Sequence, residues 1–218
     1  MVNIFGRIIK KVLLLLLIGI ILFIGFKLVM KMMYPIDYKN HIYLYSKKYN
    51  TDPYLIAAII NVESNFDKDA CSKKEARGLM QIAPTTGKWA AEKLNLKNFT
   101  LDSLYEPETN IMIGSWYLNV LNEEFDGNLP IILAAYNGGS GNVNKWLLDS
   151  RYSDDGKSLK HIPFKETRDY VDKVLENYEK YKKIYRGTFE EDKYLKDGFL
   201  DKNINRFKRT IKEYLKNA

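Results

Sequence analysis

The strongest constraint on this chain is an apolar stretch near its N-terminus. No charged residue occurs from Val12 to Phe26, and the apolar run extends to Met30 if the Lys27 ammonium reaches back to a membrane surface. Roughly 20 apolar residues match the hydrocarbon thickness of a bilayer, where a helix satisfies its own backbone hydrogen bonds. The stretch therefore predicts a transmembrane helix.

A cleavable signal peptide is the alternative, because Arg7, Lys10 and Lys11 precede the apolar run as a positively charged leader would. The residues that follow the run, G-F-K-L-V-M-K-M-M-Y, are bulky or charged and offer no small-x-small cleavage site. We therefore expect an uncleaved anchor. Lysines flank both of its ends, so the charge pattern does not give its orientation.

We expect three parts: a basic flank and transmembrane anchor (1–33), a globular domain (34–186) and a basic amphipathic helical tail (187–218). Tyrosines among lysines open the second part and predict an interfacial belt followed by a short helix. In the tail, apolar residues recur at helical spacing among lysines and arginines. This helix either docks on the domain or lies against anionic lipid or a partner.

The formal net charge of the 218 residues is +7, and their positive charges are scattered and concentrated at the two ends. Because they are not interleaved with aromatics in one motif, we expect no nucleic-acid partner, and an anionic lipid surface or cell-wall polymer accounts for them equally well. The single cysteine, Cys71, excludes an internal disulfide, and burial is its simplest explanation.

Helical periodicity dominates the globular part, and no strand-rich, repeated or low-complexity segment interrupts it. The pattern predicts an all-α domain. Core positions are expected at Trp89 and Leu94, and along the stripe Ile111, Gly114, Leu118, Leu121 and Phe125, where Gly114 would let another helix come close. Later helices are expected to bury I-I-L-A-A-Y before a glycine cluster, then Val143, Trp146 and Leu147, and finally Val171, Val174, Leu175, Tyr178 and Tyr185.

One central helix is predicted to begin at Asp52-Pro53, because an Asp side chain caps the first turn and proline suits its first position. Glu63 falls within the apolar stripe of this helix. A buried carboxyl without a partner has a raised pKa, as a general acid requires. The alternative is a structural ion pair, for which Arg77 is a candidate.

Four segments stand out together: Glu63-Ser64, Gly78-Leu79-Met80-Gln81, Ala135-Tyr136-Asn137-Gly138-Gly139, and Ile162-Pro163-Phe164 running into Glu166-Thr167-Arg168-x-Tyr170. Their order and spacing resemble the soluble-lytic-transglycosylase family from about residue 43 to residue 185. The resemblance implies a lysozyme-like helical fold and cleavage of the glycan strands of peptidoglycan. It covers neither the apolar segment nor the tail.

The resemblance also implies roles for individual residues. Glu63 matches the single catalytic glutamate, and Ser72 matches a serine that orients sugar and catalytic groups. The remaining matches imply substrate-binding groove residues: Met80, Gln81, Tyr136, Asn137, Glu166 and Tyr170, with Tyr136 also positioning the glutamate.

Two departures from the family pattern concern loops. Where the family commonly has Gly-Ala-x-Gly, this chain has Glu75-Ala76-Arg77-Gly78, and A-Y-N-G-G replaces the commoner A-Y-N-A-G. The first departure puts the geometry of that loop in question. Neither departure removes a catalytic group.

The implied mechanism needs no metal or cofactor. Glu63 protonates the oxygen between N-acetylmuramic acid and N-acetylglucosamine, then accepts the proton of the muramic C6 hydroxyl as it closes on C1, giving a 1,6-anhydro end. One carboxylate suffices because the nucleophile is already on the substrate. Asp67 and Asp69 would be candidates for a lysozyme-like hydrolytic route, but they lie in a D-K-D loop typical of solvated surface charge and lack a full calcium-loop pattern.

The main hypothesis is a membrane-anchored lytic transglycosylase whose globular domain lies outside the cytoplasmic membrane. It would remodel wall or open a passage for an envelope-spanning machine such as a secretion or conjugation apparatus. The alternatives are a hydrolytic muramidase and a non-catalytic wall-binding or assembly module.

Overall fold

The computed structural model describes residues 2–189 of the chain and forms two compact units, Met1–Ile36 and Asp37–Ala218. The predicted tail (187–218) lies outside the described residues except for its first three positions. The three-part division of the chain therefore stays a prediction.

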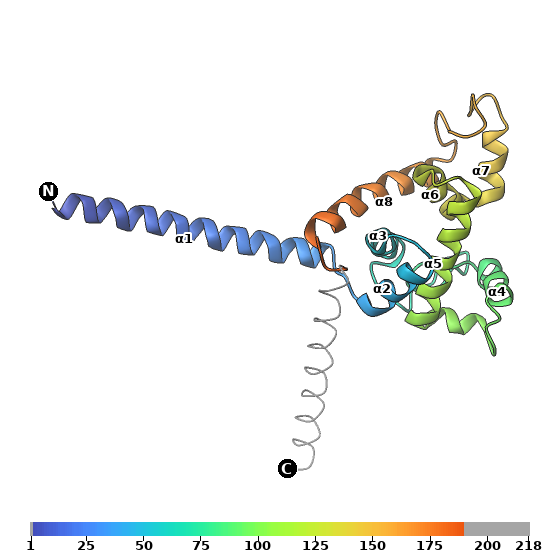
Figure 1. Cartoon of the computed structure of the whole chain (residues 1–218), viewed down its shortest axis with the longest axis horizontal. Helices are drawn as coiled ribbons and strands as arrows, with labels where there is room; N and C mark the ends of the chain where they lie inside the picture. The colour runs from blue at the N-terminus through green and yellow to red at the C-terminus, as the bar shows by residue number, and fades with distance from the viewer. Residues whose placement is uncertain (1, 190–218) are drawn as a thin grey trace, which may run out of the picture. The chain divides into compact units, whose positions relative to one another are not determined.

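The first unit contains the long helix α1 (Val2–Met33; Figure 1). Its segment Gly6–Met33 has 28 residues, a high mean hydropathy and no burial within its most apolar window. At about 1.5 Å per residue this length exceeds the roughly 30 Å hydrocarbon core of a bilayer. By length and composition the helix could cross a membrane, although an N-terminal signal sequence would have the same properties.

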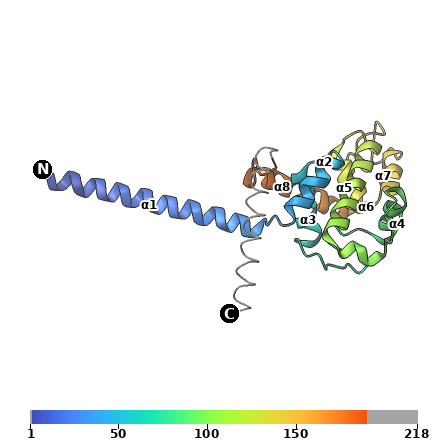
Figure 2. The same ribbon diagram turned by 60° about the horizontal axis from the view of Figure 1, so that its bottom comes forward.

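Among the residues that the structure describes, the second unit contains only helices and loops (Figure 1 and Figure 2), which confirms the all-α prediction. The helices are α2 (Lys39–Lys48), α3 (Pro53–Ser64), α4 (Pro84–Lys93), the short 3₁₀ helix η1 (Leu101–Tyr105), α5 (Pro107–Glu124), α6 (Leu129–Gly138), α7 (Ser140–Leu147) and α8 (Lys165–Ile184). Proline occupies one of the first two positions of α3, α4, α5 and α6, where the missing N–H costs nothing.

Helix α3 lies inside the domain, packed along α8 and against α2. All side chains from Ile56 to Ile60 are fully buried. As predicted, Asp52 caps the helix: one carboxylate oxygen accepts the Tyr54 N–H at 2.7 Å. The other oxygen accepts the Tyr178 hydroxyl at 2.7 Å, which ties the start of α3 to α8.

The predicted apolar stripe of α5 is buried, as are Ile131 to Ala135 of α6. Gly114, however, does not admit another helix. A Cβ at this position would lie 2.3 Å from the sulfur of Met80, so the space is filled by the side chain of a loop residue. The glycine is needed because Met80 packs directly onto the α5 backbone.

Tyr45 lies in the short helix that was predicted to follow the interfacial belt; it is buried and donates its hydroxyl to Glu108 of α5 at 2.8 Å. Two sequence expectations about burial are wrong. Trp89, expected in the core, is 38% exposed. Cys71, for which burial was expected, is exposed. Periodicity identifies an apolar face but not which neighbouring element covers it.

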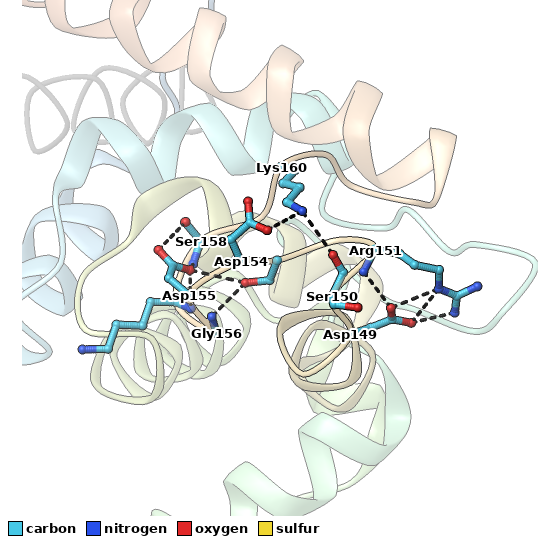
Figure 3. A network of polar contacts seen from close by, with 10 residues as sticks. Asp149, Ser150, Arg151, Asp154, Asp155, Gly156, Ser158 and Lys160 are labelled. Atoms are coloured by element: carbon cyan, nitrogen blue, oxygen red, sulfur yellow. Dashed lines mark hydrogen bonds and ion pairs between the residues drawn. The ribbon is translucent and has the colours of Figure 1, made fainter.

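The loop between α7 and α8 is held by its own polar side chains (Figure 3). The Asp155 carboxylate accepts the backbone N–H groups of Lys157 and Ser158, both at 2.8 Å, and these bonds hold its pKa well below the usual range. The Arg151 guanidinium pairs with Asp149 and lowers the pKa of that carboxyl to about 2. The loop therefore keeps a defined path to the start of α8.

Candidate active site

Glu63 lies in the last turn of α3, and its carboxyl is largely withdrawn from water. Burial raises the pKa of this carboxyl from 4.5 to about 7, and the Tyr170 hydroxyl partly offsets the rise. Arg77, the candidate structural partner, pairs instead with Asp102 at 2.9 Å. No ion pair within residues 2–189 includes Glu63. Its environment is therefore that of an acid that keeps its proton near neutral pH.

A cavity of about 580 Å³ opens beside Glu63, within the range of ligand pockets. Its walls come from the end of α3, the following loop, the first turn of α4, the middle of α5, the end of α6 and the start of α8. The lining residues are Glu63, Ser72, Lys73, Lys74, Ala76, Gln81, Ile82, Ala83, Thr85, Thr86, Tyr117, Tyr136, Asn137, Gly138, Gly139 and Glu166.

The turn at Gly78 to Gln81 is built on one buried side chain, Asn110 of α5. Its Oδ1 accepts the Met80 N–H at 2.7 Å, while its Nδ2 donates to the carbonyls of Arg77 (2.8 Å) and Leu104 (2.7 Å). Gly78 has φ +74°, and a Cβ there would lie 2.2 Å from the Leu104 carbonyl oxygen. Only glycine fits this close approach.

The same turn is fixed to α3 and to itself. The Ser64 hydroxyl donates to the Leu79 carbonyl at 2.8 Å, directly beside the glutamate. Gln81, in the left-handed region with φ 48°, lines the cavity while its amide nitrogen donates to the carbonyls of Gly78 (2.9 Å) and Ala70 (3.1 Å). Glu63 and Gln81 are thus held in fixed relation.

The structure does not bring Met80, a predicted groove residue, to the cavity wall. Its side chain is fully buried against Gly114 and does not line the cavity. What it offers the site is its carbonyl oxygen, which accepts the Tyr136 hydroxyl at 2.9 Å. Met80 therefore contributes to the site through its backbone carbonyl and not through its side chain.

Tyr136 lines the cavity, but its only hydroxyl proton is donated to Met80 and not to Glu63. Burial raises its pKa well above the usual value, and the nearby charge of Glu63 adds to the rise. Because its proton is held by the Met80 carbonyl, the Tyr136 hydroxyl is not placed to donate to a Glu63 carboxylate.

Tyr170, also expected in the groove, lies behind Glu63 and is absent from the cavity wall. Its ring is buried, and its hydroxyl approaches the Glu63 carboxyl closely enough to lower the pKa of that group. No hydrogen bond of good geometry joins them or satisfies the Tyr170 hydroxyl otherwise within residues 2–189. The hydroxyl is thus placed to donate to Glu63 when its carboxyl becomes charged.

The other expected site residues, Ser72, Asn137 and Glu166, all line the cavity. The Ser72 hydroxyl oxygen accepts the N–H groups of Lys74 (3.2 Å) and Ala76 (3.1 Å), so it also closes a turn of the loop. Glu166 is exposed in the first turn of α8. The structure brings these side chains to one cavity but does not test their roles.

Several lining residues were missed by the sequence reasoning, among them Tyr117, Thr85 and Thr86. The two threonines follow Pro84 directly after the G-L-M-Q turn, and this proximity could have identified them. Tyr117 lies on α5, where a tyrosine at helical spacing indicates a core position.

Asp67 and Asp69 do not line the cavity; Asp69 pairs with Lys68 at 2.7 Å on the surface. Within the described part of the chain, no three His, Cys, Asp or Glu side chains are grouped to hold a metal ion. Glu166 is the remaining carboxylate of the cavity wall besides Glu63.

Residues 41–159 match the family model described as the transglycosylase SLT domain. The chain is 34% identical to the soluble lytic murein transglycosylase of Salmonella typhimurium over 159 residues, 72% of this chain and 24% of the relative. It is 30% identical to the membrane-bound lytic murein transglycosylase C of Edwardsiella ictaluri, over 68% of this chain and 49% of the relative.

Solved structures show the same fold. The 70-kDa soluble lytic transglycosylase of Escherichia coli matches 72% of this chain with a TM-score of 0.64 and 30% identity, which confirms the lysozyme-like helical fold. An inactive Glu-to-Gln mutant of the Slt lytic transglycosylase of Pseudomonas aeruginosa matches 71% with a TM-score of 0.64 and 33% identity. The chain spans about a quarter of the length of the Salmonella, Escherichia and Pseudomonas proteins and about half that of the Edwardsiella protein.

Proposed function

Because the chain belongs to the transglycosylase SLT family, we propose that it is a lytic transglycosylase that cleaves the glycan strands of peptidoglycan. Relatives with the same domain are named lytic murein transglycosylases. The single observation that carries the proposal is the Glu63 carboxyl, whose pKa is raised to about 7 by burial at the wall of a ligand-sized cavity. A non-catalytic wall-binding module would not need this costly arrangement.

Glu63 acts first as an acid and then as a base. It donates its proton to the oxygen that joins N-acetylmuramic acid to N-acetylglucosamine, and the bond from that oxygen to muramic C1 breaks. The muramic C6 oxygen then bonds to C1, and its proton returns to Glu63. The products are a new 4-hydroxyl and a 1,6-anhydro end, so no water is consumed. A pKa near 7 suits both steps at neutral pH.

The neighbours of Glu63 support this exchange. The Tyr136 oxygen, whose own proton is held by the Met80 carbonyl, can accept from the protonated carboxyl. The Tyr170 hydroxyl can donate to the carboxylate after the first proton transfer. The two tyrosines thus stabilise opposite protonation states of one group. Ser72, Gln81, Asn137 and Glu166 would bind the sugars along the cavity.

Hydrolysis is the second candidate, because Glu166 provides another carboxylate in the cavity wall. A muramidase would use it to activate water, and its product would carry a reducing end. Glu166 is exposed in the first turn of α8, whereas the intramolecular hydroxyl of the substrate needs no second carboxylate. We therefore favour the anhydro product.

We also propose that α1 anchors the enzyme in the cytoplasmic membrane with its domain on the wall side, where peptidoglycan lies. The long apolar helix and the membrane-bound relatives support this association. Localised cleavage would serve wall remodelling or the passage of an envelope-spanning assembly, which would then be a partner.

The test is product analysis by mass spectrometry of purified peptidoglycan digested with the full chain. We expect anhydromuramic ends, and a loss of rate of about 10³-fold in Glu63→Gln, as general acid–base catalysis predicts. Asp67→Asn is the matched control, since Asp67 is four residues away on the exposed loop and outside the cavity. Reducing ends would assign hydrolysis instead, and an active Glu63→Gln protein would remove Glu63 from the mechanism.

A further inference from the structure

A second, smaller cavity of about 260 Å³ adjoins the first. The two share three wall residues, Thr85, Thr86 and Tyr117, so they form one continuous depression along α4 and α5. The smaller volume lies below that of a typical independent ligand pocket. The second cavity is therefore suited to hold an extension of whatever occupies the first.

Trp89 of α4 lines this second cavity and is 38% exposed. Its ring is held from two sides, by Trp116 with centroids 4.7 Å apart and by Tyr117 with centroids 6.2 Å apart. The rings of Tyr117 and Tyr136 also pack together, with their centroids 5.6 Å apart. Aromatic rings thus run without interruption from the second cavity to the wall beside Glu63.

Polar groups complete the second cavity around this exposed ring. The hydroxyls of the two threonines and of Ser140 line it, together with the Glu124 carboxylate. One Glu124 oxygen accepts the Asn144 amide at 2.7 Å, which fixes the carboxylate while its second oxygen can accept another bond. An apolar ring face beside several hydroxyls and an acceptor complements a pyranose, which has an apolar C–H face and hydroxyls at its edge.

We propose that the second cavity is a further sugar-binding subsite, in which Trp89 stacks on one sugar of a glycan whose cleaved bond lies at Glu63. This inference rests on the proposed function and adds its substrate preference. Strands long enough to reach Trp89 bind more tightly than strands that fill only the first cavity. The protein consequently favours long glycan over short fragments.

The test measures binding, so it does not depend on catalysis. The full-length Glu63→Gln protein in detergent micelles is titrated with peptide-free N-acetylglucosamine–N-acetylmuramic acid oligomers of increasing length. Affinity is expected to rise at the length that reaches the second cavity. Trp89→Ala lowers the affinity for such long oligomers about tenfold, the effect of losing one aromatic contact. The affinity for short oligomers stays within about twofold.

Two further variants separate binding from folding. Trp89→Phe keeps an aromatic platform and recovers most of the long-oligomer affinity, and Leu148→Ala, which removes an 88% exposed side chain outside both cavities, changes nothing. Tryptophan fluorescence adds a direct readout, because long oligomers alone should change the emission of Trp89, and this change disappears in Trp89→Phe. Equal losses for short and long oligomers, or no loss for long ones, would overturn the subsite. A wild-type protein that binds long oligomers with this pattern but cleaves none would contradict only the proposed activity.

Discussion

Besides its proposed part in catalysis, the protonation of Glu63 has a consequence for stability. Its folded-state pKa of about 7 lies above the unfolded value of 4.5, so the folded state binds the proton more tightly. Stability from this group is complete below pH 4.5 and is lost as the pH rises through 7. We expect Glu63→Gln to be more stable than wild type at pH 8, by at most about 3 kcal/mol, and equally stable at pH 4. Urea unfolding at the two pH values measures this, and a constant difference would contradict it.

Tyr170 should set the pH at which the enzyme loses activity. Its hydroxyl lowers the pKa of Glu63, opposing the effect of burial. Tyr170→Phe removes that hydroxyl, so the Glu63 pKa rises further and the alkaline limb of the kcat/KM profile moves to higher pH. Tyr178→Phe is the control on the same helix, because that hydroxyl bonds Asp52, far from the proton exchange. An unmoved limb in Tyr170→Phe would exclude the role proposed for Tyr170.

Glu75 is a site of local strain where the family commonly has glycine. The residue has φ 61°, so the loop keeps a left-handed conformation despite the side chain. A non-glycine residue in this region costs roughly 1–2 kcal/mol. Glu75→Gly should therefore stabilise the protein by about 1 kcal/mol, whereas Lys74→Gly, at a position without positive φ, should destabilise it by about 0.5–1 kcal/mol. Thermal unfolding of both variants measures these changes. If both substitutions destabilise the protein, the backbone at Glu75 is not strained.

At the scale of the elements, Asn110 connects α5 to the turn that carries Gln81. Its removal leaves the Met80 N–H and the Leu104 carbonyl without this partner, each costing about 1–3 kcal/mol less any relaxation, while the Arg77 carbonyl still accepts the Ile82 N–H at 3.1 Å. Asn110→Ala should lose about 3 kcal/mol of unfolding free energy, and its catalytic rate should fall as the turn loosens. Asn119→Ala on the same helix loses only an exposed bond to Glu123 and should change stability by less than about 0.5 kcal/mol. Equal effects in urea unfolding would argue against this role of Asn110.

The elements differ in how well the sequence predicts them. The start of α3 at Asp52-Pro53 and the buried run of α6 follow from local rules of capping and periodicity, and both are confirmed. Met80 and Trp89 could not be placed in this way. Met80 enters the core from a loop, because Gly114 leaves room for it, and Trp89 packs on Trp116 and Tyr117 but stays 38% exposed. Both outcomes depend on tertiary packing, which the spacing of residues along one helix does not encode.

The site shows the same division. Motif resemblance singles out Glu63, Gln81, Tyr136 and Glu166, and all four line one cavity. It does not distinguish wall from support, so it assigns Met80 and Tyr170 to the groove. The direction of each hydroxyl proton, as in the bond from Tyr136 to Met80, follows only from the packed structure.

At the scale of the whole molecule, the boundary between Ile36 and Asp37 separates the apolar helix from the compact helical unit. The core helices α3, α5, α6 and α8 all belong to the second unit. Membrane attachment and catalysis should therefore be separable. We expect the full chain to remain in the membrane fraction after alkaline extraction, whereas a protein that begins at Asp37 is recovered in the soluble fraction.

The same pair of proteins tests what the anchor contributes to catalysis. Because the described residues that line the cavity beside Glu63 all belong to the second unit, the shortened protein should cleave purified peptidoglycan at a rate within about threefold of the full chain, as expected when distant parts act independently. Its mass, compared with that of the full chain isolated from membranes, also distinguishes an anchor from a cleaved leader. A membrane-isolated protein that retains residues 1–33 supports the anchor, whereas a soluble product that lacks them would show that the apolar helix is removed after export. Loss of activity in a folded shortened protein would instead place part of the catalytic function in the first unit.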